Sequence, residues 1–270
     1  MREDDTMSLI NTINWLTKTP QQLEISEKLI PYFNQMNKRE IASYLNSFGM
    51  YKHTSNINDW IEKMENKQIV SYVRSLEKKY QHKWNGPEVA IFIFPIDQTN
   101  RKIEREYRGR SGLAFHDKLF LFLSKDVLKN DIESLFLHEY HHVCRLATVK
   151  KSEETFTIVD NMVMEGLAEN AVREIVGEEA VSNWTKLYGP DQCERFYKRI
   201  ILPHKDIARD HSKFPQLMYG TGFYPNMLGY SVGYHIVKTI MDKTGLKTKQ
   251  LLGMSSERIM KQYDGIKNTS

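Results

Sequence analysis

Three histidines and a glutamate fall within five residues of the segment DIESLFLHEYHHVCRLATVK, in which HEYHH occupies positions 138–142. Two imidazoles four positions apart on a helix lie about 40° apart around its axis, so both can reach one metal ion. This spacing selects His138 and His142, with Glu139 directly after the first. A carboxylate on the flank of that face can take a proton from a water molecule that a metal activates. The segment therefore matches the H-E-x-x-H arrangement of zinc hydrolases, and His141 is the spare histidine.

The helix that must position these residues is predicted to begin near Asp131. Its apolar residues recur at spacings of three and four, which places them on one face. The set consists of Ile132, Phe136, Tyr140, Val143 and Ala147. Because His138 and His142 point away from the centre of that face, we expect the helix to pack its apolar side into the core and to present both imidazoles on its other side.

A third metal ligand is predicted on the following helix, in VDNMVMEGLAEN. Catalytic zinc sites use three protein ligands and keep a fourth position for water. Glu165 follows His142 by enough chain for the first helix to end and the next to return antiparallel to it. Gly166 leaves room for a close helix approach beside the metal. Glu169, one turn further on, could accept the free ring N–H of a ligating histidine, which would fix its tautomer.

Peptide hydrolysis also needs a hydrogen-bond donor for the developing oxyanion. The segment FYPNMLGYSVGYHIVK offers four candidates, Tyr224, Tyr230, Tyr234 and His235. Tyr230 and Tyr234 lie four positions apart on a predicted helix, and the small residues Ser231 and Gly233 between them would allow close packing against the zinc-binding helix. Tyr230 is the preferred donor, followed by Tyr234 and His235, although each of these side chains is also typical of a buried core.

The chain is predicted to contain two parts. Residues 1–84 form a helical N-terminal region, whose last long helix is expected over residues 56–80 with Asn58 as its cap. The turn signal WNGPE ends this region. Residues 85–270 form the second part, which begins with a small sheet and continues as helices.

Two short runs of β-branched and aromatic residues predict the strands of that sheet, EVAIFIFP at 88–95 and KLFLFLS at 118–124. Gly109 and Gly112 indicate a turn or an irregular strand between them. A second long helix is expected over 153–175. The predicted fold class is therefore α+β and mostly helical.

Composition argues against several kinds of partner. The net charge of +4 is small and its charged residues are interspersed along the chain, so nucleic-acid binding is not expected. No stretch approaches 18 consecutive apolar residues and the first residues do not resemble a signal peptide, so no membrane association is expected. Two cysteines, Cys144 and Cys193, suggest reduced thiols rather than a disulfide framework. The expected location is the cytoplasm.

The motifs resemble those of known zinc peptidases. H-E-x-x-H followed by a glutamate on the next helix is similar to the gluzincins, of which thermolysin is a member, and Glu165 with Glu169 matches their pattern of two acidic residues four positions apart. The spacing after the second histidine is slightly longer than in thermolysin, so only the local motif transfers. The set LFLHEYHHVCR, VMEGLAEN and GYSVGYHIV more closely resembles the Bacillus-type family of predicted zinc-dependent proteases (YjaZ-like, a domain of unknown function) over about residues 85–245.

The resemblance implies a zincin-like catalytic core within residues 85–270 and a bound Zn²⁺, but it indicates no substrate. A peptide or protein substrate is expected from the metallopeptidase hypothesis alone. In gluzincins an edge strand just before the active-site helix pairs with an extended substrate, because a strand edge offers N–H and C=O groups at peptide spacing. The candidate here is Lys118 to Ser124, which could equally be an ordinary core strand.

The leading hypothesis is thus a zinc metallopeptidase whose ligands are His138, His142 and Glu165, with Glu139 as the general base. A non-catalytic metal-binding or sensor protein would use the same ligands and stays open as the alternative. A di-iron carboxylate bundle would need a second E-x-x-H motif. The sequence has no such motif, which argues against that class. The oligomeric state is not indicated by the sequence.

Overall fold

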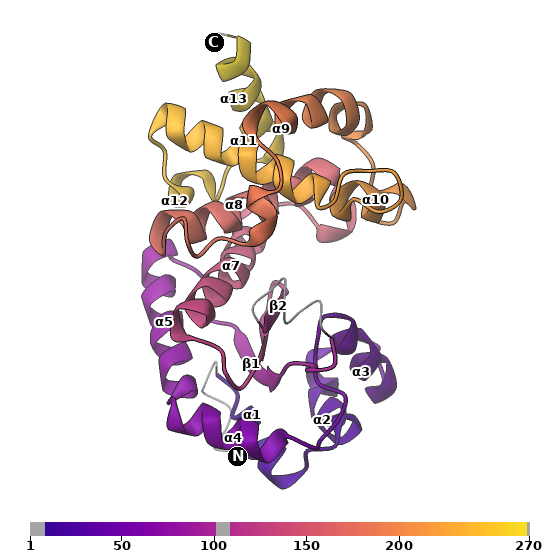
Figure 1. Ribbon diagram of the computed structural model, residues 1–270, viewed down its shortest axis with the longest axis vertical. Coiled ribbons are helices and arrows are strands. Elements are labelled where there is room, and N and C mark those ends of the chain that lie inside the picture. Colours follow the sequence, from indigo (N-terminus) through magenta and orange to yellow (C-terminus); the bar gives the residue numbers. More distant parts are fainter. Residues whose placement is uncertain (1–8, 101–108, 269–270) are drawn as a thin grey trace. The chain divides into compact units, whose positions relative to one another are not determined.

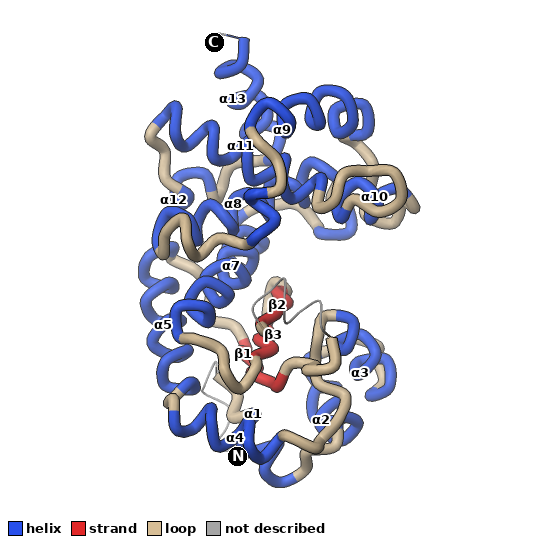
Figure 2. Tube along the Cα trace, in the orientation of Figure 1, coloured by secondary structure: helices blue, strands red, loops and turns tan. Residues whose placement is uncertain are grey.

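The computed structural model describes residues 9–100 and 109–268 (Figure 1). They divide into two compact units at the boundary between Val143 and Cys144. The described residues are mostly helical and include one three-stranded sheet (Figure 2). The predicted α+β class, mostly helical with a small sheet, is therefore confirmed. The predicted division into residues 1–84 and 85–270 concerns folding units and stays a prediction. Its first eight residues lie outside the described part of the chain.

The first unit begins with helices, which are α1 (Thr12–Lys18), α2 (Gln22–Leu29), α3 (Lys38–Ser47), α4 (Ile57–Asn66) and α5 (Ile69–Trp84). The single helix predicted over 56–80 is wrong, because α4 ends before Gln68, which has a left-handed backbone with φ 53°. The N-cap position of α4 is Asn56 and not Asn58. The ammonium of Lys67, beside the break, donates hydrogen bonds to the carbonyl oxygens of Lys125 and Val127, at 2.8 and 3.2 Å. These bonds hold the α4–α5 turn against the chain that follows the sheet.

The sheet contains β1 (Ala90–Pro95), β2 (Arg110–Ala114) and β3 (Lys118–Leu123) in the order β1-β3-β2. β3 pairs in parallel with β1 and antiparallel with β2. Because β3 is the central strand, the prediction that Lys118–Ser124 is an edge strand is wrong. Its six residues KLFLFL are all buried, a run without alternation that is typical of a strand covered on both faces.

β2 is an edge strand among the strands that the structure describes. The backbone N–H of Phe115 donates to the carbonyl of Lys118 and that of Ser124 to the carbonyl of Gly109, both at 2.8 Å. In an antiparallel pair, hydrogen-bonded positions alternate with positions whose N–H and C=O point the other way. Gly109 and Phe115 are hydrogen-bonded to β3, so the alternate positions between them, which include Gly112, direct their N–H and C=O groups toward the outer edge of β2.

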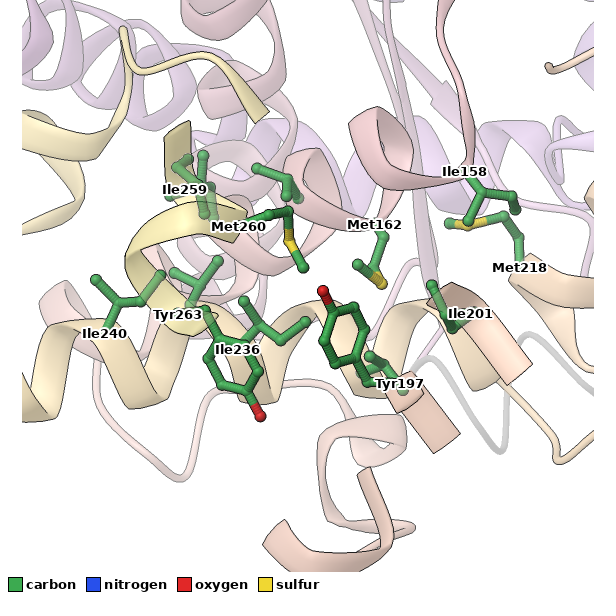
Figure 3. Packing of buried hydrophobic residues seen from close by; sticks show 14 of the residues in the cluster. Ile158, Met162, Tyr197, Ile201, Met218, Ile236, Ile240, Ile259, Met260 and Tyr263 are labelled. Carbon is green, nitrogen blue, oxygen red and sulfur yellow. The ribbon is translucent and has the colours of Figure 1, made fainter. Parts of the chain in front are cut away.

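The second unit consists mainly of helices in its described part. They are α8 (Ile158–Ile175), α9 (Pro190–Phe196), α10 (Lys213–Tyr219), α11 (Leu228–Thr244), α12 (Thr248–Leu251) and α13 (Ser256–Asn268). Their apolar faces share one core, in which Met162 of α8, Ile236 of α11 and Met260 of α13 are buried (Figure 3). Burial of this core fixes α8, the helix that carries Glu165.

α8 and α11 approach each other most closely at two glycines. A Cβ on Gly166 would lie 2.5 Å from the carbonyl carbon of Gly233, and one on Gly233 would lie 2.8 Å from the carbonyl carbon of Met162. The buried amide of Asn170 donates to the carbonyl oxygens of Gly166, at 2.8 Å, and Tyr234, at 3.0 Å, and so joins the two helices. Gly166 does permit a close helix approach, but to α11, whereas the approach predicted from the sequence was to the zinc-binding helix. Gly233 likewise packs on α8 rather than on the helix of the HEYHH segment.

Gly233→Ala is expected to lower the melting temperature by roughly 6–12 °C, because the new methyl group would meet the backbone of Met162, which cannot rotate away. Overpacking of this kind costs about 3 kcal/mol, and each kcal/mol shifts the melting temperature of a chain this size by about 2–4 °C. Differential scanning calorimetry measures the shift. Gly265→Ala in α13 is the matched control, because a Cβ there meets nothing within 4 Å. An equal shift in both variants would contradict the backbone contact.

The structure bears on two further expectations. Cys144 and Cys193 are both buried and neither is part of a disulfide. Within residues 9–100 and 109–268, no helix combines the length and the apolar character that a membrane span requires.

Candidate metal centre

The HEYHH segment lies in α7 (Lys129–Thr148), which begins two residues before the predicted start. Its predicted apolar residues from Ile132 to Val143 are fully buried, whereas Ala147 is exposed near the end of the helix. Beyond the segment, the buried guanidinium of Arg145 donates to the carbonyl oxygens of Leu252, at 2.9 Å, and Met254, at 3.2 Å. α7 is thus fixed at both sides of the histidines, which restricts the directions in which they can point.

His141 belongs to the core of the first unit. Its ring is fully buried and meets Trp84 edge to face, with centroids 5.1 Å apart and an interplanar angle of 88°. Neighbouring Tyr140 stacks on Phe136 and donates its hydroxyl hydrogen to the carbonyl of Pro87, at 2.8 Å. The aromatic surroundings of His141 agree with the prediction that it is the spare histidine.

His138 and His142 face each other one turn apart on α7. Their ring centroids are 4.7 Å apart, the ring planes meet at 88°, and the two Nε2 atoms are 3.1 Å apart. His142 is 5% exposed, whereas His138 is half-buried. Two nitrogens that bind one tetrahedral zinc at about 2.0–2.1 Å would be about 3.3 Å apart, so the observed separation fits a shared ion.

Glu165 lies in the first half of α8, which begins at Ile158 and not near Glu153 as predicted. Glu153–Thr155 form a separate short 3-10 helix, and α8 starts after Thr157, where Asp160 accepts a hydrogen bond from the Thr157 backbone N–H at 2.9 Å. One ligand atom from each of His138, His142 and Glu165 lies within 4.8 Å of the other two. These are the three residues that the sequence proposed as a set, and their assignment as metal ligands stays a prediction.

The chemistry of this donor set suits Zn²⁺. Two imidazole nitrogens and one carboxylate oxygen form the three-ligand set of catalytic zinc sites, in which a fourth position is kept for water or substrate. His138 and Glu165 are half-buried, whereas His142 is buried. Small side-chain rotations from a mutual separation of 4.8 Å would give the shorter separations of a tetrahedral site.

Glu139 lies against the edge strand β2. The side chain is buried, at 8% exposure, and it lies where a side chain on Gly112 would point, because a Cβ there would be 2.6 Å from its Cδ and Oε1 atoms. β2 is also joined to the start of α7, since the guanidinium of Arg110 forms an ion pair with Asp131. The contact of Glu139 with Gly112 was not expected from the sequence. The one sign of it in the sequence is a glycine inside a strand, which often marks a site where another part of the protein approaches the strand backbone closely.

The remaining predicted site residues all lie in the second unit. Glu169 is buried and its carboxylate accepts a hydrogen bond from the backbone N–H of Ser182, while the predicted contact with a histidine stays a prediction. The rings of Tyr230 and Tyr234 both contact Trp184, with centroids at 5.3 and 6.1 Å. Burial raises the pKa of Tyr234, so its hydroxyl keeps its proton and can donate. The assignment of either tyrosine to an oxyanion stays a prediction.

Asp160→Asn is expected to destabilise the chain at neutral pH by about 1 kcal/mol, because Asp160 supports the first turn of α8. Burial alone would raise the pKa of Asp160, but hydrogen bonds from Lys151, Thr157 and Ser256 outweigh it and lower the pKa. A lowered folded-state pKa gives stability that is present above the unfolded pKa of about 3.9 and is lost as pH falls through the folded value.

Urea unfolding of wild type and Asp160→Asn at several pH values measures this difference. The gap between the two free energies of unfolding should be widest near neutral pH and should narrow below about pH 4. A gap that stays constant over this range would contradict the role of the Asp160 charge.

The chain belongs to a family of predicted zinc-dependent proteases. Residues 69–261 match the family described as "Predicted Zn-dependent protease (DUF2268)". This range contains the sheet, α7 and α8, and thus every residue of the candidate metal centre. The family resemblance read from the sequence is confirmed.

Two relatives come from Bacillus subtilis (strain 168). The chain is 38% identical to "Uncharacterized protein YjaZ" over 257 residues, which cover 94% of this chain and 98% of that protein. It is 23% identical to "Uncharacterized protein YjfC" over 195 residues, or 68% of this chain and 64% of that protein. No solved structure matches the chain.

Proposed function

We propose that this protein is a zinc-dependent peptidase with a zincin-like catalytic core. The observation that carries the proposal is the convergence of His138, His142 and Glu165, whose ligand atoms lie within 4.8 Å of one another. Membership of the family of predicted zinc-dependent proteases supports the same reaction class. Glu139, directly after the first histidine, supplies the acid–base group that a metal-storage or sensor site would not need.

The chain's own residues have separate roles in this proposal. His138, His142 and Glu165 would hold the metal. Zinc, when bound, supplies Lewis-acid activation of water and of the substrate carbonyl. Glu139 would accept the proton of the attacking water on its carboxylate and later donate a proton to the leaving amine. Burial of Glu139 favours this exchange, because few bulk water molecules can compete for the carboxylate.

A protonated hydroxyl would complete the site by donating a hydrogen bond to the developing oxyanion. Tyr230 is the preferred donor, because its side chain is half-buried and can meet a substrate. Tyr234 is more deeply buried, at 6% exposure, and its backbone is tied to Asn170. The two tyrosines can be separated by comparing Tyr230→Phe with Tyr234→Phe.

The edge strand β2 is the better candidate for substrate binding now that β3 is known to be central. An extended peptide can add to a strand edge through main-chain hydrogen bonds. In β2 the backbone groups of Gly112 point toward the outer edge, and this residue lies beside Glu139. A peptide added there would pass close to the proposed general base.

Hydrolysis of a peptide library by the zinc-loaded chain tests the proposed function. Wild type should cleave members of the library, and Glu139→Gln should not, although it still binds zinc. A chain that binds zinc stoichiometrically and cleaves no member of the library would favour the metal-binding alternative.

A further inference from the structure

The backbone conformation of Gly112 does not require a glycine. It lies within the regular antiparallel strand β2, paired with Leu121 of β3, and it is not among the described residues with positive φ. Extended backbone of this kind is open to every residue type, and glycine weakens a strand by its greater loss of conformational freedom. The reason for glycine must therefore lie in the space around it.

That space is filled by the side chain of Glu139. A Cβ on Gly112 would come within 2.6 Å of both Cδ and Oε1 of this glutamate, well inside van der Waals contact. No other atom is closer to that position than those of Glu139. The side chain of Glu139 thus occupies the volume that any residue other than glycine would fill.

The strand is held more firmly than the glutamate. β2 is paired along its length with β3, and Arg110 anchors it to Asp131 at the start of α7. The atoms on the other side of the contact belong to the Glu139 side chain, whose bonds can rotate, whereas the strand could move only if its backbone pairing were broken. A side chain at position 112 would therefore displace the carboxylate and leave the strand in place.

We propose that Gly112 is a positioning residue. Because it has no side chain, it leaves the space in which the carboxylate of Glu139 takes the position that it needs as general base. This inference rests on the proposed function for its catalytic consequence, but the contact itself can be tested without it. Gly112 lies on the edge strand β2 beside α7. A single methyl group added at this residue would displace the carboxylate of the proposed general base.

The catalytic test compares Gly112→Ala with wild type, using hydrolysis of fluorescein-labelled casein and zinc content by atomic emission. We expect turnover to fall by about 100-fold, because a displaced base loses the contribution of general-base catalysis. The zinc-to-protein ratio should stay unchanged, and so should KM, because the substitution leaves the backbone groups at the outer edge of β2 in place. In a Glu139→Gln background, Gly112→Ala should change the remaining turnover less than twofold, since the group through which it acts is already absent.

The stability test needs neither metal nor substrate. Urea midpoints of the metal-free chain are compared for Gly112→Ala in the wild-type background and in a Glu139→Ala background. In the second background the volume is vacant and alanine is the better strand residue, so the midpoint should rise, whereas in the wild-type background it should fall or stay level. Ser111→Ala on the same strand is the control and should shift the midpoint equally in both backgrounds.

Equal shifts for Gly112→Ala in the two backgrounds would overturn the proposal, because they would show that residues 112 and 139 do not compete for one volume. Full activity of zinc-loaded Gly112→Ala would overturn it as well. If wild type hydrolyses no casein, the proposed function has failed in this assay, and the urea comparison alone still decides the contact of Gly112 with Glu139.

Discussion

Glu139→Gln is expected to lower peptide hydrolysis by about 10²–10⁴-fold while the chain keeps its zinc. The amide has nearly the shape of the carboxylate, so it fits the same volume beside Gly112. It cannot accept a proton at neutral pH, so the attacking water loses its base. The measurement is turnover of a cleaved library peptide, with zinc content determined on the same preparation.

Glu133→Gln is the matched control, because it makes the same chemical change on the same helix. Glu133 accepts hydrogen bonds from the hydroxyl of Tyr80 and the ammonium of Lys79, at 2.6 and 2.7 Å, and is not part of the candidate centre. We expect it to lose some stability and to keep full turnover. Comparable losses of turnover in the two variants would contradict a specific role for Glu139.

Glu165→Ala and His142→Ala are each expected to weaken zinc binding by at least about 100-fold. Loss of a residue that merely orients a metal ligand commonly costs 10–100-fold, and loss of a direct ligand should cost more. The wild-type melting temperature should rise on addition of zinc, because an ion that binds only the folded chain stabilises it. Neither variant should show this rise at the same zinc concentration.

His141→Gln is the control for the choice between the histidines. His141 is buried against Trp84, so this variant should lose stability and keep its zinc-dependent rise in melting temperature. The opposite pattern, with zinc lost by His141→Gln and kept by His142→Ala, would show that His138 and His141 hold the metal.

The parts of the candidate site that could be predicted are those governed by helical spacing. His138 and His142 face each other because they lie four positions apart on one helix. Their Nε2 atoms are 3.1 Å apart in the structure. The helical location of Glu165 follows from the apolar pattern of its segment. Its approach to the histidines could be proposed because the connecting chain is long enough for the first helix to end and the next to return antiparallel to it, and the ligand atoms of the three residues lie within 4.8 Å of one another.

Strand order could not be predicted in the same way. KLFLFL indicates a buried strand, but the residues of a strand do not reveal which neighbours it has, and β3 proved to be central. In the sequence, Gly112 indicates a turn or an irregular strand, whereas in the structure it makes room for Glu139 within a regular strand. Such a contact depends on tertiary packing between a strand and a helix, which periodicity cannot show.

Helix boundaries show the same limit. The predicted helix over 56–80 satisfies the apolar spacing throughout, yet Gln68 takes a left-handed backbone and Lys67 bonds to the carbonyls of Lys125 and Val127. Tertiary hydrogen bonds here outweigh local helix propensity. Gly233 likewise shows its role only through the backbone of Met162.

X-ray diffraction at the zinc absorption edge, from crystals of the zinc-loaded chain, tests the central claim most directly. The account predicts one anomalous peak about 2.0–2.2 Å from the Nε2 atoms of His138 and His142 and from a carboxylate oxygen of Glu165. A zinc ion held by other residues, or held by the two histidines while Glu165 points away from it, would contradict the account.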